Sequence, residues 1–259
     1  MKGNEYNWKL PDIDTLRNLY WNEKRSAANI AQQFGVTVGA VKNKLNRYGI
    51  PMRNMSDAQA LIANYIFLSP DGLAFIDGLL LGDGCISPNR HFTSAQYKHS
   101  DKHKDYIIWL ANKLQNMGFE MGTIKHYAKA SQLSTLYYRD LIQIRRCWYP
   151  DGNKKVPSDI ELRPITLLNW YIGDGNYHAP GCDGGGEQVS IAMEFDQEGK
   201  DLLRTKLWEL GILNSNQKTG IYIRSAGRKH FFNYMAMAFL PIPECYKYKF
   251  PERYYHGIE

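Results

Sequence analysis

The sequence lacks the features of a membrane-spanning or secreted protein. It contains no run of about 18 apolar residues, which is the length that a membrane-spanning helix needs. The N-terminal segment MKGNEYNWKL has no apolar core of the kind found in signal peptides. We therefore expect a soluble protein without a membrane partner, located in the cytoplasm, or in an organellar matrix in a eukaryotic host, and not secreted.

Cysteine and excess charge are also scarce. No CxxC motif and no paired Cys/His spacing occurs among the four cysteines, Cys85, Cys147, Cys182 and Cys245. Buried thiols in a reducing compartment therefore explain them better than a zinc site. The formal net charge of +6 is a modest excess that favours a polyanionic partner. A hydrophobic content of 44% in 259 residues supports a core for one large or two modest domains.

An apolar segment, LAFIDGLLLGDGCI at residues 73–86, ends in a Gly-Asp-Gly sequence. Its apolar residues surround the predicted helix almost completely, as is typical of a buried helix. Ala74, Gly78 and Gly82 recur every four residues and leave one helix face bare. Because glycine costs about 1 kcal/mol within a helix, this face indicates close packing against another backbone.

The same pattern occurs a second time. LLNWYIGDGN at residues 167–176 repeats the apolar helix and its Gly-Asp-Gly ending, and Pro70 and Pro164 are suited to the first turns of the two helices. A Lys-x-Pro sequence follows each of the two aspartates, Asp83 and Asp174, at a similar interval. The chain therefore contains two copies of one half-domain. An anion at a helix C-terminus is unfavourable, so a cation is expected near each aspartate, and a metal ion is the obvious candidate.

From residue 66 to residue 259 these features resemble the monomeric, two-motif LAGLIDADG homing endonucleases. The resemblance implies an α+β fold in which the two motif helices pack together along a pseudo-twofold axis. Each half would follow the order αββαββα and contribute a saddle-shaped antiparallel sheet. The domain assignment is then a helix-turn-helix domain at 1–55, a linker at 56–68, and two LAGLIDADG halves at 69–163 and 164–259.

The resemblance also implies the residues of the active site. The two terminal aspartates would bind Mg²⁺ or Mn²⁺ at the two scissile phosphates, so that the predicted metal-binding residues, with the preceding glycines, are Asp83, Asp174, Gly82 and Gly173. A basic residue late in each half would lie near the metal. Lys155 and Lys249 match this position best, and Lys154 is a neighbouring alternative.

Residues 12–50 predict a compact helical unit in front of these halves. Ser26 and Thr37 are suited to cap the second and third helices, and Gly35 lies in the turn between them. The pattern resembles a helix-turn-helix, whose second helix enters the major groove of DNA. The candidate DNA contacts of this unit are Lys42, Asn43, Asn46 and Arg47. A three-helix bundle with a solvated polar face is the alternative.

Further DNA contacts are expected on the two sheets. We predict strands at 121–127 and 135–146 in the first half and at 189–195 in the second, and a basic turn at 226–229. One face of each sheet would be covered by helices and the other would follow a DNA groove. Each candidate contact could also be only a solvated charge. The candidates are Arg90, Gln96, Lys98, Lys125, Arg139, Gln143, Arg145, Tyr222, Arg224, Arg228 and Lys229.

The resemblance implies a site-specific double-strand DNA endonuclease that acts as a monomer on a long target site. It would hydrolyse one phosphodiester in each strand with a divalent metal ion at each aspartate. An RNA maturase and a transcription regulator that does not cut DNA are the alternatives on the same fold. The two retained aspartates favour the nuclease, because a protein that does not cut DNA has no need of paired metal-binding carboxylates.

Overall fold

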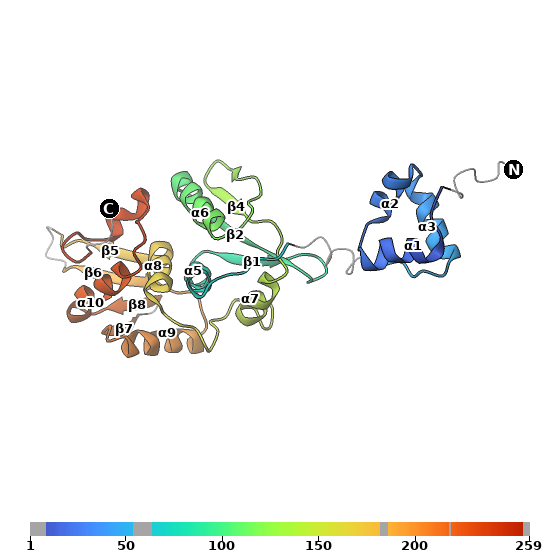
Figure 1. Cartoon of the computed structure of the whole chain (residues 1–259). Coiled ribbons are helices and arrows are strands. Elements are labelled where there is room, and N and C mark those ends of the chain that lie inside the picture. The colour runs from blue at the N-terminus through green and yellow to red at the C-terminus, as the bar shows by residue number, and fades with distance from the viewer. Residues whose placement is uncertain (1–8, 54–63, 182–185, 218, 256–259) are drawn as a thin grey trace. The chain divides into compact units, whose positions relative to one another are not determined.

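The structure is a computed structural model that describes residues 9–53, 64–181, 186–217 and 219–255 (Figure 1). The chain forms two compact units, Met1–Ala63 and Asn64–Glu259. Most of the predicted linker at 56–68 lies outside the described residues, as do the two ends of the predicted domain at 1–55. Asn64 already belongs to the second unit, where it forms a parallel β-bridge with Tyr138.

The first unit is helical and is built on capped helix starts. The side chains of Asp12, Ser26 and Thr37 each accept a hydrogen bond from a backbone N–H of the first helical turn that follows. Gly35 ends the second helix in the left-handed conformation that the tight turn requires. The helices are α1 (Ile13–Arg17), the π-helix η1 (Asn18–Asn22), α2 (Ala27–Phe34) and α3 (Val38–Arg47).

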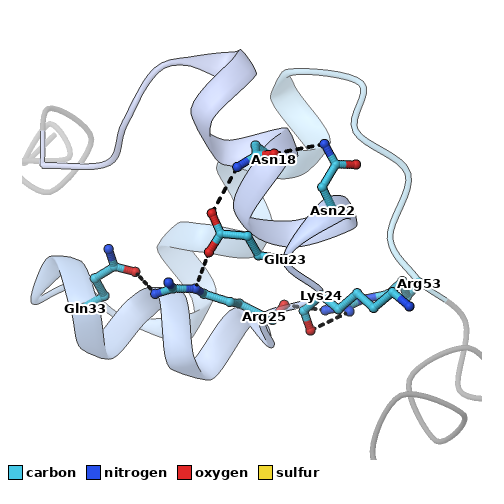
Figure 2. A network of polar contacts seen from close by, with 7 residues as sticks. All are labelled: Asn18, Asn22, Glu23, Lys24, Arg25, Gln33 and Arg53. Carbon is cyan, nitrogen blue, oxygen red and sulfur yellow. Dashed lines mark hydrogen bonds and ion pairs between the residues drawn. The ribbon is translucent and has the colours of Figure 1, made fainter.

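A polar network joins the end of the first unit to the loop before α2 (Figure 2). Arg25 pairs with Glu23 at 2.8 Å and donates a hydrogen bond to Gln33 on α2 at 2.7 Å. The guanidinium of Arg53 lies 4.1 Å from the centroid of the Tyr20 ring and donates to two backbone carbonyls of this loop. The network therefore fixes the last described residue of the first unit against its helices.

The second unit consists of two copies of the order αββαββα, which confirms the predicted fold. Each copy contains one four-stranded antiparallel sheet, with the orders β1-β2-β4-β3 and β5-β6-β8-β7. The first copy is α5 (Pro70–Leu81), β1 (Cys85–Pro88), β2 (Ala95–Asp101), α6 (Lys104–Asn116), β3 (Lys125–His126), β4 (Ser131–Ser134) and α7 (Leu141–Trp148). The second is α8 (Pro164–Asp174), β5 (Gly175–His178), β6 (Gln188–Ala192), α9 (Gln197–Glu209), β7 (Asn214–Gln217), β8 (Gly220–Ile223) and α10 (Ser225–Ala236), followed by the 3-10 helix η2 (Glu244–Lys249).

The duplication extends to the strand register. Cys85, two residues after Asp83, lies opposite Lys98 in the first sheet. Asn176, two residues after Asp174, lies opposite Ser190 in the second sheet. In each half, therefore, the residue two positions after the aspartate lies in the first strand of the sheet and pairs with the second strand.

The motif helices α5 and α8 lie side by side between the two sheets (Figure 1). Glycine is required at their crossing, because a Cβ atom on Gly78 would lie 2.5 Å from the Thr166 carbonyl oxygen and 2.9 Å from the Asn169 Cβ. Farther along, a Cβ on Gly82 would lie 3.7 Å from the Gly173 Cα. The bare face predicted from the glycine spacing is therefore the face at which the two backbones approach.

Two predicted elements of the second unit are wrong. Residues 135–146 do not form a strand, because 141–148 form the helix α7, whose buried Leu141, Ile142 and Trp148 recur at helical spacing. Residues 226–229 do not form a turn, because α10 begins at Ser225 and includes them. The predicted strands at 121–127 and 189–195 are shorter in the structure, where β3 and β6 occupy only part of each range.

The cysteines are not all buried. Cys85 and Cys245 are half-buried and free, Cys147 is exposed and free, and Cys182 lies outside the described residues. The prediction of buried thiols is therefore wrong for Cys147, which lies on the solvent side of α7. Among the described residues, no helix has both the length and the apolar character that crossing a membrane demands.

Asp77 on α5 is a buried carboxyl group whose ionisation affects the stability of the fold. Its carboxylate accepts a hydrogen bond from the Trp148 indole at 3.0 Å, and burial raises its pKa to about 6. The folded protein therefore binds more protons than the unfolded chain between pH 3.8 and about 6, and the Asp77 contribution to stability is lost as the pH rises through this window. Asp77→Asn keeps an acceptor for the indole without the charge. We expect it to raise the free energy of unfolding at pH 7.5 by about 1–2 kcal/mol.

Urea unfolding of the wild type and of Asp77→Asn at pH 7.5 and pH 4 measures this effect. The gain should become much smaller at pH 4, where the carboxyl of the folded protein is protonated and that of the unfolded chain, with a pKa of 3.8, is only about half ionised. A gain of the same size at both pH values would contradict the electrostatic explanation, because every other titrating group is common to the two proteins.

Candidate active site

The two aspartates lie together at the ends of the motif helices. Asp174 is the last residue of α8, and Asp83 follows the end of α5 by two residues. A Cβ on Gly173 would lie 3.5 Å from the Gly82 Cα and 3.8 Å from the Asp83 backbone nitrogen, so the two helix ends are in contact. Both carboxylates line one cavity of about 290 Å³. The pseudo-twofold crossing thus brings the aspartates into one site.

The site is electrostatically unfavourable for two anions. Burial raises the pKa of Asp174 to about 7, and the charge of Asp83 acts in the same direction. Partial burial, followed by the charge of Asp101, raises the pKa of Asp83, which is the more exposed of the two. A cation at this position would stabilise both ionised carboxylates. Among the described residues, no group of three or more histidine, cysteine, aspartate or glutamate side chains could hold a metal ion.

Two lysines meet the carbonyl ends of the motif helices. Lys154 Nζ donates hydrogen bonds to the carbonyl oxygens of Gly82 at 2.7 Å and Gly84 at 2.9 Å. Lys249 Nζ donates to those of Ile172 at 2.7 Å and Gly173 at 3.0 Å. Burial lowers the pKa of both lysines, that of Lys249 to about 8, and the charge of Asp174 opposes the shift in each case. Each ammonium group therefore offsets the negative end of one helix dipole.

The structure corrects the predicted basic residue of the first half. Lys155 is half-buried and pairs with Asp151 at 2.9 Å, whereas Lys154 lies at the site. Residues 154–157 belong to no helix or strand, and in this segment Lys154 reaches the end of α5 while Lys155 pairs with Asp151. The Lys-x-Pro pattern failed because the lysine at the site stands three residues before its proline in the first half and two in the second.

Five of the candidate DNA contacts lie on strands or in a strand-to-strand turn. Gln96 and Lys98 lie on β2, Lys125 on β3 and Tyr222 on β8, and Arg90 lies in the turn between β1 and β2. Arg90 and Lys125 are exposed, and the other three are half-buried. On β2 these polar residues alternate with buried ones, as expected for a sheet with one covered face. Arg90 and Lys125 are thus accessible to a partner, whereas the Gln96 amide already donates a hydrogen bond to the Tyr137 hydroxyl.

Other candidates do not lie on the sheets. Gln143 and Arg145 belong to α7 and Lys229 to α10, while Arg224 caps α10 and Arg139 precedes α7. Arg145 donates to the Ile86 carbonyl at 2.5 Å and lies 4.4 Å from the centroid of the Tyr149 ring. Its guanidinium therefore joins α7 to β1.

Arg228 is the clearest correction among the predicted DNA contacts. It is buried, pairs with Glu187 at 2.8 Å and donates to the Tyr222 hydroxyl at 2.7 Å. The prediction is wrong because α10 includes this residue and turns it towards the sheet, whereas a turn would have exposed it. The hydroxyl of Tyr222 is engaged by the same bond.

The sequence did not single out Glu194, which also lines the cavity. It follows β6 next to Met193 and Phe195 and lies near Asp83, Asp174 and Lys154, since its charge acts on the pKa of all three. The apolar and polar residues around it alternate along the strand, and that alternation was the available signal. No short sequence motif marks its approach to the site.

Two pseudo-symmetric αββαββα halves, joined where two closely packed helices bring their terminal aspartates together, define the LAGLIDADG class of proteins. The model of the LAGLIDADG DNA endonuclease family matches residues 73–238, which is more than half of the chain. The chain therefore belongs to the LAGLIDADG DNA endonuclease family.

The chain is also similar in sequence to individual curated proteins. An uncharacterized protein of Methanocaldococcus jannaschii is 30% identical over an alignment of 166 residues that covers 61% of this chain and 63% of that protein. Protein RecA of Mycobacterium shimoidei is 26% identical over 226 residues, covering 81% of this chain and 51% of the relative. The chain thus spans about half to two thirds of the length of these curated relatives.

Among solved structures, the homing endonuclease I-WcaI bound to its DNA recognition sequence is similar in fold. The TM-score is 0.57, with 18% sequence identity, and the match covers 72% of this chain and 88% of that one. At this identity the likeness supports the fold alone.

Proposed function

We propose that the protein is a site-specific double-strand DNA endonuclease, a homing endonuclease that cuts one phosphodiester in each strand. The observation that carries the proposal is the pair of aspartates in one cavity at the crossing of the motif helices. A single Asp-Gly turn after a helix is common, but a duplicated one whose two copies meet at a shared cavity is suited to two scissile phosphates. The homing endonuclease I-WcaI, which is similar in fold, is bound to its DNA recognition sequence, and this supports DNA as the substrate.

The residues of the cavity fit a divalent cation. Asp83 and Asp174 provide two oxygen ligands of the kind that Mg²⁺ and Mn²⁺ prefer, and the raised pKa of Asp174 reflects a buried charge that a cation would stabilise. The carbonyl oxygens of Gly82 and Gly173 accept lysine hydrogen bonds, but each keeps a second lone pair. Water molecules and the DNA phosphates would complete the coordination shell of the cation. When bound, such an ion polarises the phosphate and lowers the pKa of a water molecule.

Side chains of the protein would provide the remaining stabilisation of the transition state. Lys154 and Lys249 hold a positive charge at each helix end, where it stabilises the negative charge that develops on the phosphate. Their hydrogen bonds to backbone carbonyls fix the ammonium groups before the substrate arrives, so little reorganisation is needed. Glu194 at the cavity wall would orient water near Lys154.

The target sequence can be found by selecting bound duplexes from a randomised library and then incubating the selected duplex with the protein and Mg²⁺. The endonuclease proposal predicts a cut at one fixed position in each strand. Tight binding with no cut in either strand would favour the regulator, and stimulated splicing of an intron RNA without DNA cleavage would favour the maturase.

We propose that the first unit is a helix-turn-helix domain that extends the DNA contact beyond the core site. Val41 and Leu45 of α3 are buried in the core of the unit, whereas the candidate contacts of the same helix are all exposed, namely Lys42, Asn43, Asn46 and Arg47. Amide side chains suit adenine edges, and Arg suits guanine or phosphate.

Replacing Asn46 and Arg47 together by Ala should weaken binding to the selected duplex about tenfold or more, because one base contact and one phosphate or base contact are lost. The slope of log affinity against log salt should fall by about 1. The matched control is Arg17→Ala with Gln32→Ala, which removes an exposed arginine and an exposed amide elsewhere in the unit. Filter binding at several salt concentrations measures both quantities. Equal affinities and equal slopes for the wild type and both variants would overturn the helix-turn-helix proposal.

A further inference from the structure

Lys249 rests on an aromatic ring that belongs to the same short helix. The helix η2 carries Tyr246 and Lys249, and both side chains are buried. Lys249 Nζ lies 4.6 Å from the centroid of the Tyr246 ring, within the range of a cation–π interaction. The same ammonium donates to the Ile172 and Gly173 carbonyls at the end of α8. The position of the Tyr246 ring therefore limits where the ammonium can lie.

The first half of the second unit holds that ring in place. The Tyr246 hydroxyl donates a hydrogen bond to Asp101 Oδ2 at the end of β2. Asp101 Oδ1 accepts from the backbone N–H of His103 at 2.6 Å, which fixes the carboxylate. His103 and Tyr106 contact the ring edge-on, with centroid distances of 5.3 and 5.1 Å. Asp101, His103 and Tyr106 all belong to the first half, whereas Lys249 binds the carbonyl end of α8 in the second half.

The other lysine of the site is supported differently. Lys154 Nζ lies 5.9 Å from the centroid of the Phe195 ring, which has no hydroxyl group. Its two carbonyl hydrogen bonds are as short as those of Lys249. The two lysines therefore make similar hydrogen bonds to backbone carbonyls. They differ in the neighbouring ring, because Tyr246 is held by a hydrogen bond through its hydroxyl and Phe195 is not.

We infer that Tyr246 and Asp101 are positioning residues for Lys249, through a buried hydrogen bond that joins the first half to the active site of the second. The inference rests on the proposed endonuclease function and adds that the two strand cuts depend unequally on this bond. Removing the hydroxyl leaves Asp101 Oδ2 without its donor and releases the ring. Lys249 then stabilises the reacting phosphate less well, because this stabilisation requires the ammonium group to be positioned to within about 0.5 Å.

Tyr246→Phe is the direct test, since it removes one oxygen atom and keeps the ring. With each strand of the selected duplex labelled, we expect cleavage of one strand to slow about tenfold or more while cleavage of the other stays within about twofold, so that nicked duplex accumulates. The loss should appear in kcat, with KM unchanged. The control is Tyr248→Phe, which removes the hydroxyl of an exposed tyrosine on the same helix and should leave both rates unchanged.

Asp101→Asn is the conservative variant. The asparagine oxygen can accept from the His103 N–H, and its amide can donate to the Tyr246 oxygen, so the bond persists with donor and acceptor exchanged. Because this substitution also removes the charge of Asp101, which acts on Asp83, we expect the ratio of the two strand rates, rather than each rate, to stay within about threefold of the wild-type ratio. Equal slowing of both strands by Tyr246→Phe, or no slowing of either, would overturn the inference.

A second measurement does not need cleavage. Limited acylation of the full-length protein, read by mass spectrometry, reports how accessible and mobile each lysine is. Tyr246→Phe should increase the labelling of Lys249 severalfold and leave that of Lys154 unchanged, because only Lys249 rests on this ring. Unchanged labelling of Lys249 contradicts the positioning role. A wild type that cuts no duplex contradicts the endonuclease proposal instead, and the labelling alone then decides the role of Tyr246.

Discussion

Asp83→Asn and Asp174→Asn should each reduce double-strand cleavage by about 1,000-fold or more while leaving DNA affinity within about threefold. An amide has the shape of the carboxylate but no negative charge, so it binds a divalent cation at the crossing of the motif helices much more weakly. Affinity should survive because each substitution removes an anion from a surface that faces a polyanion.

Cleavage and binding of the selected duplex, measured under the same salt conditions, separate the two effects. Asp151→Asn is the matched control, because it makes the same chemical change at an exposed residue whose carboxylate pairs with Lys155 and accepts a hydrogen bond from the backbone N–H of Asn153. The control should cut like the wild type. An Asp83 or Asp174 variant that keeps a tenth of the wild-type rate would exclude that carboxylate from the metal site.

Gly78→Ala should destabilise the second unit by about 2–4 kcal/mol, although alanine normally stabilises a helix by about 1 kcal/mol relative to glycine. The added methyl would lie 2.5 Å from the Thr166 carbonyl oxygen, a backbone atom of the facing helix that cannot rotate away. The two motif helices would have to separate, and the ends that carry the aspartates would separate with them.

The control for this variant is Gly72→Ala in the first turn of the same helix. A Cβ there would lie 3.4 Å from Ser69 Oγ and 3.5 Å from the Leu68 Cδ2, both ordinary contacts. Urea unfolding should show Gly72→Ala near the wild type or slightly more stable. If Gly78→Ala proves as stable as Gly72→Ala, the close approach of the two backbones does not limit the stability of the fold.

The duplicated motif made the centre of the molecule predictable from the sequence. Gly78 and Gly82 indicated a helix face bare enough for a second backbone, and the structure places that backbone there. Pro70 and Pro164 marked the helix starts, since proline at the first turn lacks only an N–H that has no partner in the helix. A single Asp-Gly turn would not have indicated an active site, but its duplication in one chain did.

The basic residue of the first half was not predictable from spacing alone. Lys154 and Lys155 are neighbours with the same chemistry, and the local backbone direction decides which one faces the helix end. The backbone N–H of Lys155 bonds to the Trp148 carbonyl at 2.8 Å, a contact that depends on where α7 ends. Because α7 was predicted as a strand, that information was missing.

Tertiary contacts decided the remaining differences. Arg228 looked like part of a basic turn, but a buried ion pair with Glu187 holds it in α10. The bond between Asp101 and Tyr246 joins residues far apart in the chain, and neither lies in a repeated motif. The hydrophobic periodicity of a sequence indicates which face of a helix or strand is buried, but not which residues that face contacts. Pairs such as Asp101 and Tyr246 can therefore be identified only from the structure.

The central claim is that Asp83 and Asp174 together bind divalent metal at the crossing of the motif helices. The most direct measurement is anomalous X-ray scattering from Mn²⁺ in a crystal of the full chain with its selected duplex. The account predicts Mn²⁺ peaks within ligand distance of both carboxylates and adjacent to a phosphate of each strand. Bound DNA with no Mn²⁺ at either aspartate would contradict it.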